Sequence, residues 1–135
     1  MPALIILFLA VDLASIRTEA NLERRSDLAL DYAHQAVDTA RDSYASGDVS
    51  KMRAALVEAG DAVDVSYQSL SETVKNPRNN KSFKRAELRT RELMRRLDGL
   101  AQTVSVDDRD PITKLRDRIA EVHDNLLKGI MSKKK

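Results

Sequence analysis

The segment "VSKMRAALVEAGDAVDVSYQSL", Val49 to Leu70, decides the fold. Its apolar and small residues recur in alternating steps of three and four without a break, which is the spacing of one face of an α-helix. Alternation with a period of two, which would indicate a strand, is absent. The segment therefore predicts a long helix with one narrow buried face. That face consists of Val49, Met52, Leu56, Ala59, Val63, Ser66 and Leu70.

Three further segments carry the same pattern, and short breaks at "SGD", "NPRNN" and "DDRDP" separate the four. Gly47 suits a left-handed helix end, while Ser82 and Asp110 suit the N-cap position, just before the first residue of the helix that each precedes. No helix with so narrow an apolar face is stable alone, so the four must pack together. The sequence predicts an all-α, antiparallel up-down four-helix bundle over residues 21–131. The other three faces are Leu22, Ala29, Ala33, Ala36, Val37, Ala40 and Tyr44; Phe83, Ala86, Thr90, Leu93, Leu97, Leu100 and Val104; and Ile112, Leu115, Ile119, Val122, Leu126 and Ile130.

The composition agrees with a helical domain. The chain has 135 residues, which fits one domain, and only 4 Gly and 3 Pro, which disfavours a turn-rich sandwich or barrel. There is no cysteine, so disulfides, thiolate metal sites and thiol nucleophiles are excluded. The spatial order of the helices and the oligomeric state are left open.

The first residues, "MPALIILFLAVDLAS", contain nine consecutive apolar residues from Ala3 to Val11. The run is too short to span a membrane but matches the core of a secretory signal, although no basic residue precedes it. We expect residues 1–20 to be a signal peptide or a flexible apolar segment; a buried helical start is the alternative. Export would start the mature domain between residues 15 and 21. Residues 132–135, "SKKK", form a basic tail.

Charge is divided unevenly along the chain. Residues 19–74 carry five bases and eleven acids, whereas residues 75–135 carry seventeen bases and nine acids. The stretch from Lys75 to Leu97 alone has nine Lys or Arg and two Glu. The basic half could pair with the acidic half across the bundle, bind an acidic protein or envelope polyanion, or bind nucleic acid. Any ligand site would centre on Arg78, Lys81, Lys84, Arg85 and Arg89.

A metal site finds little support. Asp27, Asp31, His34 and Asp38 share one ridge of the first helix, and Asp31 with His34 is the weak metal candidate. Di-iron bundles need two such pairs and two further glutamates facing inward, which the chain lacks, so a solvated acidic ridge is favoured.

No cofactor is expected. A haem held by the two histidines, with Met52 and Met94 as other axial ligands, would lack an attachment motif. "DDRD" lacks the Gly and Glu of a calcium loop. No nucleophile arrangement or phosphate loop is present, so an enzyme is not expected.

Two resemblances add context. "YASGDVSKMRAALVEA" resembles the turn between the helices of a tetratricopeptide repeat, with Ala40, Gly47, Asp48, Leu56 and Ala59 at matching offsets; Met52 and Asp64 depart from that pattern, and no second copy follows. Over most of its length the chain also resembles small exported helical bacterial proteins of unassigned function, through "NLERRSDLAL" and "FKRAELRTRELMRRLDGL".

The sequence therefore predicts a non-enzymatic, periplasmic or secreted bundle that mediates protein or envelope-polyanion interactions. The alternatives are a carrier of a ligand or metal ion in the bundle core, and an intracellular nucleic-acid-binding protein that uses the basic third helix.

Overall fold

The computed structural model describes residues 13–73 and 76–132. The apolar run Ala3–Val11, Lys75 and the final three lysines lie outside these residues. The described chain is all-helical and contains no strand, as the hydrophobic spacing predicted. None of its helices is both long enough and apolar enough to cross a membrane. Its long elements are α2 (Leu22–Ala45), α3 (Val49–Ser71), α4 (Lys81–Thr103) and α5 (Asp110–Met131), with 3-10 turns η1 (Pro77–Asn79) and η2 (Val106–Asp108) before α4 and α5.

Local chemistry explains where most helices begin. The side chain of Asn21 accepts from the Arg24 N–H and begins α2, and Asp48 accepts from the Lys51 N–H and begins α3. Gly47, at φ +84°, makes the tight reversal between these helices at no steric cost.

Two of the predicted caps are wrong. Asn80, not Ser82, caps α4, because its side-chain oxygen accepts from the N–H groups of both Ser82 and Phe83. Helix α5 starts at Asp110 itself and has no side-chain cap.

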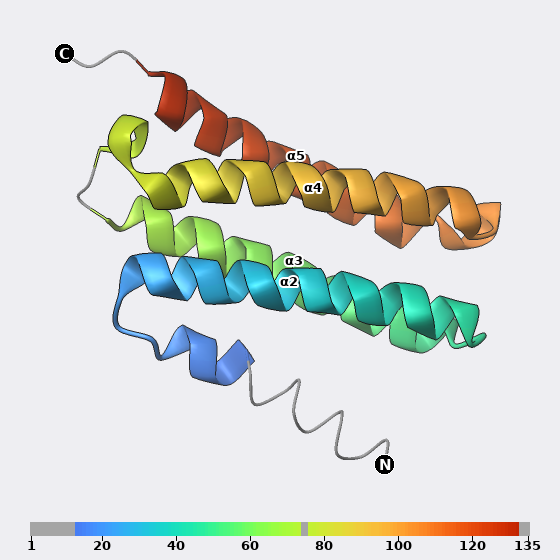
Figure 1. The fold of residues 1–135 in the computed structure, drawn as a ribbon. Coiled ribbons are helices and arrows are strands. Elements are labelled where there is room, and N and C mark those ends of the chain that lie inside the picture. The colour runs from blue at the N-terminus through green and yellow to red at the C-terminus, as the bar shows by residue number, and fades with distance from the viewer. Residues whose placement is uncertain (1–12, 74–75, 133–135) are drawn as a thin grey trace.

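The four long helices pack together as two hairpins. Helix α2 packs on α3 and α4 packs on α5, while α2 lies beside α4 and α3 beside α5. Figure 1 shows that direction reverses within each hairpin and that α2 and α4 run the same way. Ion pairs fix this alignment, because Asp27 meets Arg85 and Asp38 meets Arg96, each 58 residues further on. Neighbours across the two hairpins are therefore parallel.

The core sits between the hairpins. All seven apolar-face positions predicted on α4 are buried, as are the first five of the six predicted on α5. The buried faces of α2 and α3 are wider than predicted and rich in Ala and Ser. The chain before α2 lies beside part of them, next to Tyr32 on α2 and Val65 on α3. Residues 13–17 are helical, and Leu13 and Ile16 belong to the core. Buried residues outside the predicted faces of α2 and α3 include Ser26, Leu30, Tyr32, Ala55, Ala62, Val65 and Ser69.

Polar groups inside the core are satisfied locally. The hydroxyls of Ser26 and Ser66 lie 2.6 Å apart across the α2–α3 interface. Ser69 and Thr90 donate to backbone carbonyls one turn earlier in their own helices, at 2.7 and 2.8 Å. Each of these hydroxyls therefore already has a hydrogen-bond partner within the protein.

Candidate partner-binding face on helix α4

The cations of α4 separate into two flanks. Residues one apart on a helix point about 100° apart, so Lys84 and Arg85, or Arg95 and Arg96, face different surroundings. We define the α2-facing flank as Arg85, Arg89 and Arg96. We define the outer flank as Lys81, Lys84, Leu88, Arg91 and Arg95.

Every cation of the α2-facing flank is paired with an aspartate of α2. Arg85 Nη1 lies 2.5 Å from Asp27 Oδ2, and Arg89 Nη1 lies 2.6 Å from Asp31 Oδ1. Arg96 pairs with Asp38 in the same way. These side chains are 25 to 57% exposed, so each pair contributes only about 0–1 kcal/mol. Together they fix which helix lies beside α4.

His34 belongs to the same contact. The Arg96 Nη1 donor lies 3.1 Å from His34 Nδ1. Burial lowers the pKa of His34, and the positive charge of Arg89 lowers it further. The imidazole is therefore neutral near pH 7, with Nδ1 accepting from Arg96 rather than pairing with Glu92, whose carboxylate lies 3.5 Å away. The Nε2 atom of His34 is buried and has no hydrogen-bond partner within the described ranges.

The weak metal candidates, Asp31 and His34, lie among the contacts between α2 and the α2-facing flank of α4. The carboxylate of Asp31 is held by Arg89, and the Nδ1 of His34 faces Arg96. Within residues 13–73 and 76–132 no group of three or more His, Asp or Glu side chains is arranged to hold a metal ion. His123, the second histidine considered for haem, lies apart at the α4–α5 interface, bonded to Glu87. The arrangement is suited to pairing helices rather than to coordination.

The outer flank has a different environment. Lys81, Lys84 and Arg95 are exposed and take part in no ion pair within the described part of the chain. Leu88 lies among them with 55% of its surface exposed, one of few large apolar side chains in solvent. Arg91 is bound to Glu87 one turn earlier, at 2.5 Å, but remains half exposed. The result is a basic row with an apolar centre.

The five predicted contact residues are divided between the two flanks. Lys81 and Lys84 lie on the outer flank, Arg78 is exposed in the adjoining η1 turn, and Arg85 and Arg89 face α2. The predicted contact set left out three members of the outer flank, Leu88, Arg91 and Arg95. The helical period could have grouped them with Lys84, but only the position of α2 shows which side is open.

The third side of α4 is anchored to α5 by a buried carboxylate. Glu87 Oε2 accepts from His123 Nε2 at 2.7 Å and from Arg91, and the side chain is only 9% exposed. Burial alone would raise the pKa of Glu87, but the hydrogen bonds from His123 and Arg91 outweigh it, so the pKa is lowered. Further along, Arg116 Nε donates to Asp98 at 3.0 Å.

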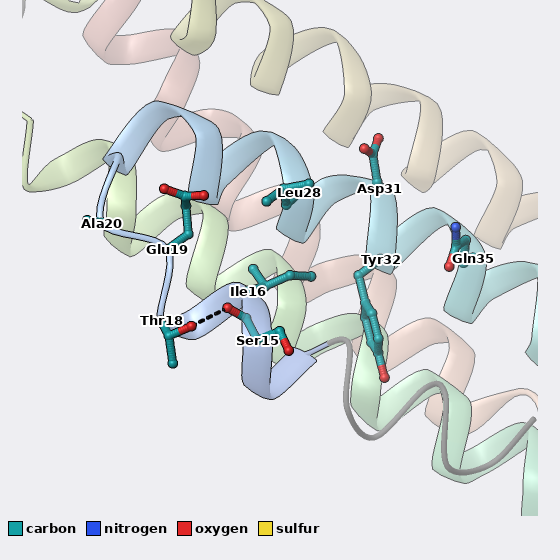
Figure 2. Close-up of a pocket in the computed structure, with 9 residues that line it drawn as sticks. All are labelled: Ser15, Ile16, Thr18, Glu19, Ala20, Leu28, Asp31, Tyr32 and Gln35. Carbon is teal, nitrogen blue, oxygen red and sulfur yellow. Dashed lines mark hydrogen bonds between the residues drawn. The ribbon is translucent and has the colours of Figure 1, made fainter. Parts of the chain in front are cut away.

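The surface also has shallow open grooves. One groove of about 550 Å³ lies between the segment before α2 and α2 itself. Figure 2 shows Ile16 on the segment before α2 and Leu28 on α2, and Asp31 and Tyr32 leaving α2 in opposite directions. Thr18 Oγ1 donates to the Ser15 carbonyl at 2.7 Å and closes the turn at its rim. Polar and apolar side chains line the groove in similar measure, and it is open to solvent.

The chain matches no protein-family model, no curated protein and no solved structure.

Proposed function

We propose that this protein is a non-enzymatic interaction module that binds an acidic protein partner through the outer flank of α4. The observation that carries the proposal is the contrast within one helix. Three arginines on the α2-facing flank are each neutralised by an aspartate, while Lys81, Lys84 and Arg95 on the outer flank have no counter-ion among the residues that the structure describes. A row of unpaired cations attracts acidic surfaces and speeds their encounter.

The apolar centre favours a protein over a nucleic acid. Leu88, more than half exposed, adds the apolar contact on which protein interfaces depend. Single-stranded nucleic acid is held by stacking on aromatic side chains, but the only aromatic side chain in the described α4, Phe83, is 6% exposed.

A carrier function has less support. The hydroxyls of Ser26, Ser66 and Thr90, the polar groups on the predicted core faces and beside them, bond to one another or to the backbone, so none of these three is left to orient a ligand. We also propose that the whole domain is an up-down four-helix bundle. The reversal of direction at each long helix supports this, although the neighbours across its two hairpins are parallel.

We propose an extracytoplasmic location on the strength of the apolar run and the small residues after it. Cleavage after Ala20 would remove Leu13 and Ile16, two buried residues, and leave Leu28 and Tyr32 open to solvent or to a partner. Mass spectrometry of the native N-terminus tests this: a first residue between 15 and 21 supports export, and an intact Met1 contradicts it.

Binding of fluorescent poly-L-glutamate to the full chain tests the proposed function. We expect binding that weakens steeply as salt increases, because exposed charge pairs are screened. The triple variant Lys81→Gln, Lys84→Gln, Arg95→Gln should bind about tenfold or more weakly, since it loses three contacts of a few tenths to one kcal/mol each. Unchanged binding by the variant, or tighter binding of polyphosphate than of poly-L-glutamate at equal charge, would count against an acidic protein partner.

A further inference from the structure

The outer face of α5 carries the opposite charge to the outer flank of α4. Asp117, Glu121 and Asp124 follow one another at steps of four and three, so they form one row along α5. Their side chains point outward, with Asp117 70% and Asp124 69% exposed. Because α5 packs beside α4, the acidic row and the basic row are neighbours on one surface of the protein. Lys114 and Lys128 bound the acidic row at its two ends, so this surface is positive along α4 and negative along the middle of α5.

Two contacts between α4 and α5 show which residues of the two rows lie at the same height, or level, along the helix axes. Glu87 meets His123, and further along Asp98 meets Arg116 on the antiparallel α5. Between these contacts α4 advances by 11 residues (98 − 87) while α5 goes back by 7 (123 − 116), so levels are obtained by interpolating between the two contacts. Two outer cations of α4 therefore stand level with two carboxylates of α5. The level pairs are Arg91 with Glu121 and Arg95 with Asp117.

These level residues do not pair within one chain. Within the described ranges Arg95 and Glu121 take part in no ion pair. Arg91 binds Glu87 of its own helix, and the ion pair of Asp117 is with the adjacent Arg116, at 3.8 Å. Both rows face away from the core, so each is available to a surface that approaches from outside. The nearest match for such a surface is the same face of another copy, because it carries both charges at the required levels.

We propose that the acidic partner of the outer flank is a second copy of this chain. A two-fold axis parallel to the helices would place α4 of each copy over α5 of the other without changing their levels. Arg91 would then meet Glu121 and Arg95 would meet Asp117, each twice. Lys84 would lie within a helical turn of the level of Lys128, a like-charge contact that limits the affinity. The inference rests on the proposed function, since it names the partner of the same flank.

The size of the face is suited to a weak, reversible dimer. Helices of 23 and 22 residues are about 35 Å long, and two side by side are about 18 Å wide. Each copy could therefore cover roughly 600 Å², at the lower end of stable interfaces. Leu88 is the only large apolar side chain in the described α4 that is more than half exposed, so the charged residues would determine the alignment of the two copies.

Sedimentation velocity of the full chain tests the proposal, from micromolar to near-millimolar concentration at low and high salt. We expect the sedimentation coefficient to rise with concentration at low salt only. Arg95→Glu and Asp117→Arg should each abolish that rise, and the double variant should restore it because the charges are exchanged. Both positions are exposed, so the melting temperatures should match that of the unaltered chain and exclude misfolding.

Three results separate the outcomes. Restoration by the double variant supports the dimer. A chain that stays monomeric at every concentration but binds poly-L-glutamate through the outer flank overturns the dimer and leaves the proposed function standing. Self-association that neither single variant weakens also overturns the dimer, because another surface must then be responsible.

Discussion

The two flanks of α4 differ although they have nearly the same composition and interleave in sequence. Lys84 is exposed and unpaired within the described residues, while the next residue, Arg85, binds Asp27 at 2.5 Å. Arg95 and Arg96 repeat the contrast, since only Arg96 reaches an aspartate. The 100° turn between successive residues and the position of α2 produce the whole difference. A run of basic residues therefore does not identify a binding site until the neighbouring helix is placed.

The contrast also explains the uneven distribution of charge along the chain. The acidic first hairpin supplies Asp27, Asp31 and Asp38, and the basic second hairpin supplies their three arginine partners. Exposed pairs of this kind contribute little stability, but a helix placed in another register would leave them unpaired. Only the cations that remain after this pairing are free to bind a partner.

The largest difference is expected between two single variants of α4, one at a leucine in the core and one at a leucine on the outer flank. Leu97→Ala should lower the free energy of unfolding by about 3 kcal/mol, because it leaves a cavity at a fully buried position. Leu88→Ala should change it by no more than about 0.5 kcal/mol. Urea unfolding followed by circular dichroism measures both; equal losses would show that α4 is oriented differently.

The next largest loss of stability is expected at Glu87, on the side of α4 that faces α5. Glu87→Gln should destabilise the chain at neutral pH by about 1–3 kcal/mol, because a buried carboxylate that accepts from two cationic or polar donors is lost. The pKa of Glu87 is lowered in the folded chain, so its contribution is present above its ordinary pKa of 4.5 and disappears as pH falls below that value.

As the pH falls below about 5, the Glu87→Gln variant should therefore lose less stability than the unaltered chain. Melting curves recorded across this range measure the difference. Glu121→Gln, at an exposed position of α5, is the matched control and should leave the profile unchanged. A profile of Glu87→Gln that follows the unaltered chain into acid would contradict the buried hydrogen bonds.

A smaller effect should separate adjacent arginines. Arg96→Gln should destabilise the chain by about 1 kcal/mol, since it breaks the bond to Asp38 and the contact with His34. Arg95→Gln should have almost no effect. A double-mutant cycle with Asp38→Asn measures the coupling directly. Coupling of Asp38 to position 95 rather than 96 would reverse the assignment of the flanks.

The smallest effect is the titration of His34. Its pKa is lowered from 6.5 by burial and by Arg89, so the unfolded chain takes up a proton more readily than the folded chain as pH falls through 6.5. Stability should therefore decline modestly below that pH. His34→Gln, which cannot titrate, should flatten this part of the profile. A decline of the same size in the variant would assign it to another group.

Hydrophobic spacing predicted most of the fold. The steps of three and four gave four long helices and most buried positions of α4 and α5, because a helix covered on one side buries one narrow stripe. On α2 and α3 the same rule missed Tyr32 and Val65, since the chain before α2 lies beside a second side of these helices. The hydrophobic pattern of one helix does not tell whether other segments cover it on one side or on two.

The candidate site was only partly predictable for a related reason. The basic stretch indicated α4, and helical geometry could group Lys84 with Arg95. The choice between the two flanks required the parallel alignment of α2 and α4, which arises from packing between segments 58 residues apart. The missed cap at Asn80 has a local cause, because both Asn80 and Ser82 can accept from the first turn and Asn80 comes first.

One matched comparison tests the central claim most directly. Two variants each remove three positive charges from α4: Lys81→Gln, Lys84→Gln, Arg95→Gln on the outer flank, and Arg85→Gln, Arg89→Gln, Arg96→Gln on the α2-facing flank. Poly-L-glutamate affinity and melting temperature are measured for both. We predict that the outer variant loses affinity and keeps its melting temperature, whereas the α2-facing variant melts earlier and keeps its affinity while folded. Equal loss of affinity in the two would contradict the account, because only net charge would then matter.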